Sequence, residues 1–205
     1  MILGQVPLEI LVVTYNHARE PQDIDFEDMF PNHQQYNIIA FAGQECVENV
    51  EEKVNLIANY LGKDYNRVDF IGKGQIFLVV FVKVYDWYFM RELKKSYVMK
   101  DLLGYGWKGG TMIQFTLYDT SFSFINCHLE SGQNAVDKRL KMAQSILREI
   151  SVENGSTFEP DAIADINFFL GDLNFRLNRT YTEHVSQVYN SPQMVSQYDQ
   201  LYIGR

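Results

Sequence analysis

The stretch that decides the fold is residues 166–174, with the sequence INFFLGDLN. Its first five residues are mostly apolar and predict a buried strand. The strand leads into Gly171, and then into Asp172 and Asn174, two polar side chains suited to binding water or phosphate. An aspartate after a glycine is also common in ordinary turns. The meaning of this segment therefore depends on the rest of the chain.

Three other predicted strands also end in polar residues. They end in Thr14-Tyr15-Asn16, in Gln44-Glu45 and in Asn126-Cys127-His128. Strands held in a rigid sheet can bring their ends together at one edge, where side chains are placed more firmly than on free loops. The pattern therefore predicts one polar site built from several strand ends.

The residue types at these ends suit metal-assisted phosphate chemistry. Glu45 and Asn16 offer the oxygen ligands that Mg²⁺ prefers. His128 can donate a hydrogen bond to a phosphoryl oxygen. Asp172 can orient or deprotonate an attacking water, and Asn174 can position that water or the phosphate. Each residue alone also has an ordinary structural explanation, so these residues by themselves indicate a soluble α/β domain and leave a hydrolase as one option.

The hydrophobic pattern predicts an α/β (α+β) domain in which strands outnumber helices. We expect a polar, helical tail over residues 180–200, an ambiguous segment at 85–101 and a glycine-rich loop at 104–110. Recurring hairpin-like connections favour two mostly antiparallel sheets flanked by helices. Strands are expected at 8–14, 36–42, 68–71, 75–83, 111–118, 122–128 and 166–170, and amphipathic helices at 47–61 and 136–150.

Composition limits the class of partner. The chain has 205 residues, 46% of them hydrophobic, with 14 Phe and 13 Tyr, which is enough for a real core and argues against disorder. Lys and Arg total 18 against 26 Asp and Glu, a formal net charge of −8. Such a chain is a poor general binder of nucleic acid. Attraction to a phosphate substrate must then come from a metal ion and a few placed cations.

The two cysteines, Cys46 and Cys127, lie far apart without a metal-type spacing. We expect both to be free, buried thiols in a reducing compartment. The sequence shows no signal-peptide pattern and no apolar run near the roughly 20 residues that span a bilayer. The expected location is the cytoplasm, with peripheral membrane contact left open.

Several segments, taken in order, resemble the inositol polyphosphate 5-phosphatases of the endonuclease/exonuclease/phosphatase superfamily. The most specific is LGDLNFRL at 170–177, which resembles the family signature G-D-L-N-[YF]-R-[IL]. FINCHLESG at 124–132 resembles F-[IV]-N-[SC]-H-L-x-[AS]-G. Shorter matches are VVTYN at 12–16, GQE at 43–45, KGG at 108–110 and YDQL at 198–201.

The resemblance implies a DNase I-like, four-layer α/β-sandwich that removes the 5-phosphate from phosphoinositides or soluble inositol polyphosphates with Mg²⁺. By this likeness Glu45 is the main metal ligand, helped by Asn16. His128 contacts the scissile phosphate, Asp172 activates or orients the water, and Asn174 holds the water or stabilises the developing charge.

Further positions carry weaker implications. Lys108 and Arg139 are implied either as contacts to phosphate or as structural cations, and Arg176 as structural. Trp107 stands where the family usually has an asparagine, which puts the hydrogen bonding of that loop in question. Gly43 replaces the leucine of the family's L-Q-E segment, a change in packing.

The family's later segments, Pro-[TS]-Tyr-Lys, P-x-W-C-D-R and S-D-H, do not occur before Arg205. We therefore expect residues 1–205 to form a single partial catalytic domain, without the C-terminal third and its last strands, and to have little activity as a fragment. The alternative is a catalytically inactive phosphatase-like domain that serves as a scaffold or interaction subunit. A sphingomyelinase or endonuclease of the same fold is disfavoured by the Phe175-Arg176-Leu177 extension and by the acidic charge. The preferred inositol phosphate and any protein partners are not determined by the sequence.

Overall fold

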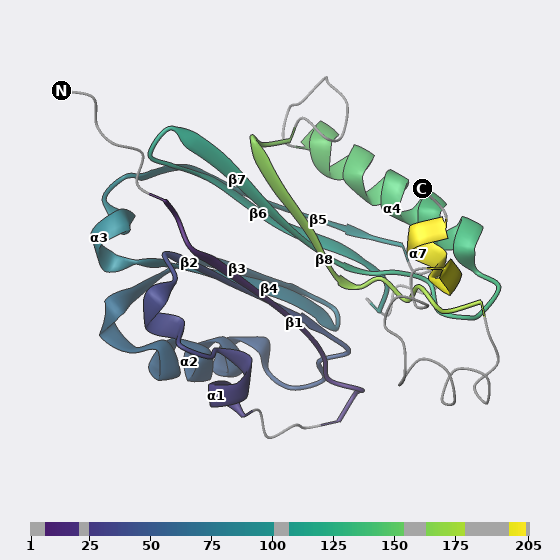
Figure 1. The fold of residues 1–205 in the computed structure, drawn as a ribbon, viewed down its shortest axis with the longest axis horizontal. Helices are drawn as coiled ribbons and strands as arrows, with labels where there is room; N and C mark the ends of the chain where they lie inside the picture. The colour runs from purple at the N-terminus through teal and green to yellow at the C-terminus, as the bar shows by residue number, and fades with distance from the viewer. Residues whose placement is uncertain (1–6, 21–24, 101–106, 154–162, 179–196, 204–205) are drawn as a thin grey trace.

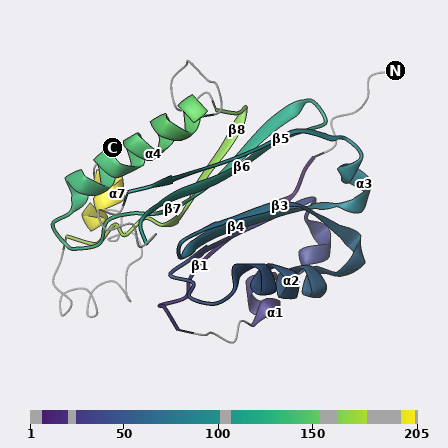
Figure 2. The same cartoon turned by 180° about the vertical axis from the view of Figure 1, so that it is seen from behind.

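The structure, a computed structural model, describes residues 7–20, 25–100, 107–153, 163–178 and 197–203. Two four-stranded sheets face each other, and helices cover their outer faces (Figure 1). Figure 2 shows the same layers from behind. This arrangement confirms the predicted sandwich of two mostly antiparallel sheets flanked by helices.

The first sheet has the strand order β1-β2-β4-β3. β1 pairs with β2 in parallel, and the other two pairings are antiparallel. β3 and β4, expected from the sequence as strands at 68–71 and 75–83, pair as an antiparallel hairpin. The strand bounds are Ile10–Asn16 for β1, Ile38–Gln44 for β2, Tyr65–Lys73 for β3 and Ile76–Lys83 for β4.

The second sheet has the order β5-β6-β7-β8. β7 and β8 are parallel, and the other pairings are antiparallel. Each sheet therefore contains one parallel pair, and these two pairs carry the polar strand ends. The bounds are Met90–Met99 for β5, Gly109–Leu117 for β6, Thr120–His128 for β7 and Ile166–Asp172 for β8.

Helices form the outer layers. α1 (Phe26–Met29) and α2 (Val50–Leu61) lie on the first sheet, and α4 (Val136–Glu153) lies on the second (Figure 1). α3 (Val84–Trp87) follows β4 on the path to the second sheet, and α7 (Gln200–Ile203) lies by α4. Short 3-10 turns occur at His33–Gln35 and Gly62–Asp64. In the described part of the chain, no helix is long and apolar enough to cross a bilayer.

Three apolar clusters fill the spaces between the four layers. β2 shows why its sequence is continuously apolar: Ile38, Ala40 and Ala42 face the other sheet, while Ile39 and Phe41 face α2. A strand buried on both faces has no solvent side on which polar residues could alternate. β7 divides in the same way, with Phe122 and Phe124 between the sheets and Ile125 and Cys127 towards α4.

Local signals set the ends of α2. The Asn49 side chain accepts a hydrogen bond from Glu51 N at 3.0 Å, which caps the first turn. Gly62 follows the last turn with φ 74°, a conformation that glycine adopts readily at the end of a helix. The helix is therefore held between two caps and packs its apolar side on the first sheet.

The structure also settles or extends several expectations. The ambiguous segment 85–101 becomes α3 and the edge strand β5, whose side chains are largely exposed. β1 and β2 extend to Asn16 and Gln44, because the ladder between them continues through these polar residues. Gly109 and Gly110 begin β6. Most of the tail expected at 180–200 and residues 104–106 of the glycine-rich loop lie outside the described residues.

Candidate active site

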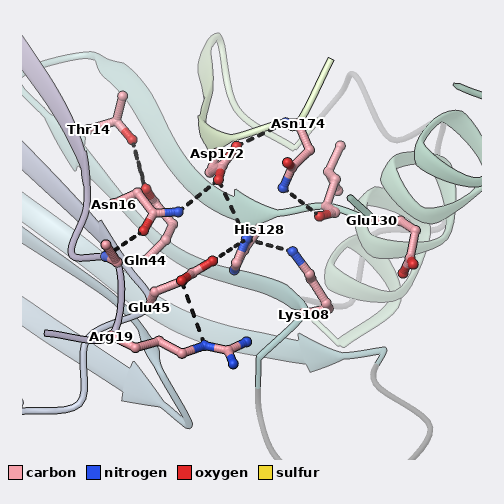
Figure 3. A network of polar contacts seen from close by, with 12 residues as sticks. Thr14, Asn16, Arg19, Gln44, Glu45, Lys108, His128, Glu130, Asp172 and Asn174 are labelled. Atoms are coloured by element: carbon pink, nitrogen blue, oxygen red, sulfur yellow. Dashed lines mark hydrogen bonds and ion pairs between the residues drawn. The ribbon is translucent and has the colours of Figure 1, made fainter. Parts of the chain in front are cut away.

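The polar strand ends meet at one edge of the sandwich. In the first sheet Asn16 pairs with Gln44, so β1 and β2 end level with each other. In the second sheet His128 pairs with Asp172, so β7 and β8 also end together. Since both parallel pairs run towards the same edge, the residues at and after these ends face one another across the two sheets, as Figure 3 shows.

Glu45, His128 and Asp172 form the centre of the site. One ligand atom from each lies within 4.8 Å of the others. His128 Nε2 is 3.6 Å from Glu45 Oε1 and 3.5 Å from Asp172 Oδ2 (Figure 3). The imidazole is 1% exposed, against 23% and 28% for the two carboxylate side chains. The histidine thus forms the floor of the site, and the carboxylates remain accessible.

Two asparagines hold Asp172. Asn16 Nδ2 donates to Asp172 Oδ2 at 2.8 Å, and the backbone N–H of Asn174 donates to Asp172 Oδ1 at 3.0 Å. The Asn16 amide is itself oriented, because its Oδ1 accepts from Ala18 N at 2.8 Å. The side chain of Asn174 donates to Leu129 O at 3.0 Å. Both carboxylate oxygens of Asp172 are therefore fixed by donors from two different strand ends.

Backbone strain accompanies these positions. Glu45 and Asn174 adopt left-handed φ values of 53° and 56°, which are uncommon for residues other than glycine. Gly171 has φ 119°, and a Cβ there would lie 2.0 Å from Cys127 O. The glycine of the Gly-Asp-Leu-Asn segment is therefore required where β8 approaches β7 just before Asp172.

A buried polar link joins the two sheets beneath the site. Gln44 Nε2 donates to Asn126 Oδ1 at 2.8 Å. Asn126 Nδ2 donates to Gly43 O at 3.1 Å and to Phe77 O at 2.7 Å. Both side chains are almost completely buried, so these bonds form away from water. They fix the separation of the sheets at the end that carries the functional residues.

Lys108 brings a cation to the cluster. Its Nζ lies 2.6 Å from His128 Nε2. Burial lowers the pKa of Lys108, and the carboxylates of Asp172 and Glu45 oppose that shift. Burial and the Lys108 ammonium lower the pKa of His128, again against these two carboxylates. Both shifts favour the neutral forms, and the two nitrogens lie close enough to share one hydrogen bond beside the carboxylates.

Arg19 and Trp107 complete the accessible side. Arg19 Nε lies 3.6 Å from Glu45 Oε2, and its guanidinium carbon is 4.1 Å from the centre of the Trp107 ring. The tryptophan at the family's asparagine position therefore supports an arginine beside the main carboxylate. The structure also explains why a glycine stands at position 43, because the Phe77 ring occupies the space that a Cβ would need.

The other predicted cations do not reach the cluster. Arg139 is fully buried; it donates to Glu130 O at 3.1 Å, to Gly132 O at 2.8 Å and to Gln200 Oε1 at 2.6 Å. These partners hold the Arg139 side chain away from the Glu45–His128–Asp172 cluster. Arg176 donates to Asn174 Oδ1 at 3.0 Å and so supports the site from outside.

The donor set fits a hard divalent cation. Glu45 and Asp172 supply two accessible carboxylates whose oxygens face each other, and the amide oxygen of Asn16 lies on the same strand-end edge. Mg²⁺ and Ca²⁺ are bound by such oxygens, with water and substrate phosphate completing the shell. Glu45, Asp172 and Asn16 are therefore the residues that would hold a metal. The sequence predicts Asp172 only as a catalytic residue.

The structure brings together Asn16, Glu45, Lys108, His128, Asp172 and Asn174, and leaves Arg139 apart. Sequence reasoning missed Arg19, because it lies in a polar loop with no motif of its own. It also missed the Gln44–Asn126 link. Both residues belong to predicted strand ends, but a contact between residues 82 positions apart has no sequence signal.

This sandwich and its edge cluster define a protein of the DNase I-like class. The chain belongs to the endonuclease/exonuclease/phosphatase family 2, whose model matches residues 13–203. The described site residues all fall within that range.

Several curated relatives are inositol polyphosphate or phosphoinositide 5-phosphatases by name. Type I inositol polyphosphate 5-phosphatase 4 of Arabidopsis thaliana is 31% identical over 195 residues, which cover 88% of this chain and 33% of that protein. Synaptojanin-2 of Rattus norvegicus is 34% identical over 108 residues, 52% of this chain and 7% of that protein. The chain thus spans a third or less of the length of these relatives.

Solved structures agree on the fold. The inositol polyphosphate 5-phosphatase domain of SPsynaptojanin, in complex with inositol (1,4)-bisphosphate and a calcium ion, matches with a TM-score of 0.76 and 23% identity. The match covers 95% of this chain and 61% of that one. A Cimex nitrophorin, a ferrous NO complex, matches with a TM-score of 0.71 and 18% identity over 95% of this chain and 70% of that one. Since this fold carries more than one function, function has to be argued from the site.

Proposed function

We propose that this chain is part of a Mg²⁺-dependent phosphomonoesterase that removes the 5-phosphate from phosphoinositides or soluble inositol polyphosphates. The observation that carries the proposal is the convergence of Glu45, His128 and Asp172 within 4.8 Å, with Asn16 bonded to Asp172. Two carboxylates, an imidazole and a lysine at one edge suit hydrolysis of a phosphate ester.

Each group in the site has a different role in the proposed hydrolysis. Asp172, held by Asn16 and by the Asn174 backbone, orients the attacking water and takes its proton. The Lys108–His128 pair delivers a hydrogen bond and positive charge to the phosphoryl oxygens. A cation held by Glu45, Asp172 and Asn16 would neutralise charge on the transferring phosphoryl group.

The cofactor and substrate class draw support from the relatives. The SPsynaptojanin domain was solved with calcium and inositol (1,4)-bisphosphate, and the Arabidopsis relative is an inositol polyphosphate 5-phosphatase by name. The acidic net charge of −8 supports a placed cation over a broadly basic surface as the source of attraction to phosphate. We propose Mg²⁺ because the donor set is oxygen-rich.

The same fold also supports a non-catalytic alternative. The nitrophorin has this fold and was solved as a ferrous NO complex, and the chain spans only part of its phosphatase relatives. A phosphatase-like scaffold would keep the sandwich and need no turnover. Turnover by the full-length protein is therefore the measurement that separates the two functions.

The test is phosphate release by the full-length protein from a short-chain phosphatidylinositol 4,5-bisphosphate and from inositol 1,4,5-trisphosphate, with Mg²⁺ and with a chelator. We expect release only with Mg²⁺. Asp172→Asn keeps the shape of the side chain but lowers kcat/KM by about 100- to 10,000-fold, the usual worth of a general base. Asp119→Asn, fully exposed at the far turn of the second sheet, is the matched control and keeps full activity.

Two outcomes contradict the proposal. Full activity in folded Asp172→Asn removes Asp172 from the mechanism. No release from either substrate by wild-type protein with a normal unfolding transition supports the scaffold function.

We also propose that the protein acts in the cytoplasm, with transient membrane contact when the substrate is a lipid. Support comes from Cys46 and Cys127, which are free and buried, as is usual in reducing compartments. Fractionation of cells that express the full-length protein tests this; recovery from the secreted fraction contradicts it.

A further inference from the structure

A second cluster of side chains that could hold a metal ion follows the ends of β1 and β2 in sequence. His17 follows the last residue of β1, and Cys46 and Glu48 follow β2, which runs side by side with β1 (Figure 1). One ligand atom from each of the three residues lies within 4.8 Å of the others. None of the three belongs to the Glu45–His128–Asp172 cluster.

The backbone holds this second cluster in place. His17 N donates to Gln44 O at 2.8 Å, and Cys46 N donates to Gln75 O at 3.1 Å. Three segments are therefore tied together around the cluster: the end of β1, the end of β2 and the β3–β4 turn. A ligand set mounted on hydrogen-bonded backbone changes little in geometry when an ion enters.

The buried ring of His17 lacks hydrogen-bond partners among the described residues. Its side chain is 0% exposed, and neither ring nitrogen has a hydrogen-bond partner among the described residues. Its ring packs edge-on against Tyr15, with centroids 4.9 Å apart, and tilts against Phe77 at 5.9 Å. Buried polar atoms in native structures are almost always paired, so two unpaired nitrogens beside a buried thiol point to a missing ligand.

We propose that His17, Cys46 and Glu48 bind one divalent cation of the zinc type. A thiolate, an imidazole and a carboxylate are the donors that Zn²⁺ takes in proteins, whereas Mg²⁺ prefers oxygen alone. On binding, the Cys46 thiol gives its proton to solvent, and the sulfur forms the new bond to the metal. Three protein ligands leave one position of a tetrahedral site for water.

Lys53 modulates this site. Its side chain, 5% exposed, forms an ion pair with Oε2 of Glu48. The ammonium competes with an incoming cation for the carboxylate and repels it. A carboxylate has two oxygens, so Glu48 can serve both, at the expense of affinity for the metal. Removing the charge of Lys53 therefore strengthens metal binding.

The position of the second cluster gives it a structural consequence. His17 and Cys46 come one residue after Asn16 and Glu45, the proposed ligands of the first site. An ion at the second cluster would crosslink the two chain segments that follow those ligands in the sequence. It would also restrict the backbone of Glu45, which has a left-handed φ. Binding at this cluster does not depend on the proposed phosphatase activity.

Cobalt provides the probe. A thiolate bound to Co²⁺ gives a charge-transfer band in the near ultraviolet, and Zn²⁺ displaces the ion and removes the band. We titrate Co²⁺ into the reduced, tag-free, metal-stripped full-length protein. We expect the band to saturate at about one ion per chain for this single site. The Glu45–His128–Asp172 cluster has no sulfur, so an ion bound there cannot produce this band.

Matched variants assign the ligands. Cys46→Ala loses the band, whereas Cys127→Ala keeps it, because Cys127 is fully buried between the second sheet and α4. His17→Gln weakens binding at least tenfold. Lys53→Met tightens binding roughly tenfold through removal of a neighbouring positive charge, an increase that misfolding cannot produce.

The inference is overturned if wild-type protein shows no thiolate band, or if Cys46→Ala retains it. Unchanged cobalt affinity in Lys53→Met also contradicts it. His17 would in these cases be a buried neutral ring that packs with Tyr15 and Phe77. Loss of the band together with retained phosphatase activity would leave the proposed function intact.

Discussion

Replacing Asn126 by alanine tests whether the link between the sheets holds the site together. The change removes three hydrogen bonds, to Gln44 Nε2 at 2.8 Å, Gly43 O at 3.1 Å and Phe77 O at 2.7 Å. A net contribution of about 1 kcal/mol for each bond gives a loss of about 3 kcal/mol. Domains are stabilised by only about 5–15 kcal/mol, so the loss is large.

Urea unfolding followed by fluorescence measures this loss as a lower midpoint with an unchanged slope. The matched control is Asn59→Ala, an exposed asparagine on α2, where alanine is neutral or slightly stabilising through its helix propensity. A loss for Asn126→Ala within about 0.5 kcal/mol of this control would refute the reasoning, because surface changes commonly stay within that range.

Two further predictions concern the strand ends. Gly171→Ala forces a Cβ to within 2.0 Å of Cys127 O at φ 119°; we expect it to lower the unfolding free energy by at least about 2 kcal/mol, and a neutral result would contradict the need for glycine there. Burial, with a smaller contribution from Lys53, lowers the pKa of His17 from 6.5 to about 4. Between pH 6.5 and about 4 the unfolded chain binds a proton on His17 more readily than the folded protein does. The unfolding free energy of the metal-free protein therefore has its full value above pH 6.5 and falls by roughly 3 kcal/mol as the pH is lowered towards 4. His17→Gln should flatten the plot of unfolding free energy against pH over this interval; an unchanged slope would exclude His17 as its source.

The apolar runs in the sequence are sufficient to determine the fold class. β2 is buried on both faces, so its residues 38–43 carry no polar side chain and are easily recognised as a strand. The Gly-Asp-Leu-Asn segment is also decisive, because its glycine is required by the approach of β8 to β7. These are local constraints, and local constraints leave a pattern in the sequence.

Segment 85–101 shows where this reasoning stops. β5 is an edge strand with largely exposed side chains, so it has neither a continuous apolar run nor a clean alternation. Its pairing with β6, which a single segment cannot encode, decided its structure.

The sequence by itself determined which residues could do phosphate chemistry, because residue type and position at a strand end are local properties. Only the tertiary structure decided that Asn16 hydrogen-bonds to Asp172 and that Lys108 contacts His128. It also decided that Arg139 donates its hydrogen bonds to two backbone carbonyls and to Gln200. Asn16 and Asp172 are 156 positions apart, and they meet only because two parallel strand pairs end at the same edge of the sandwich. The physical reason is that strand register and sheet packing depend on the whole core, whereas the chemical nature of a side chain depends on one residue alone.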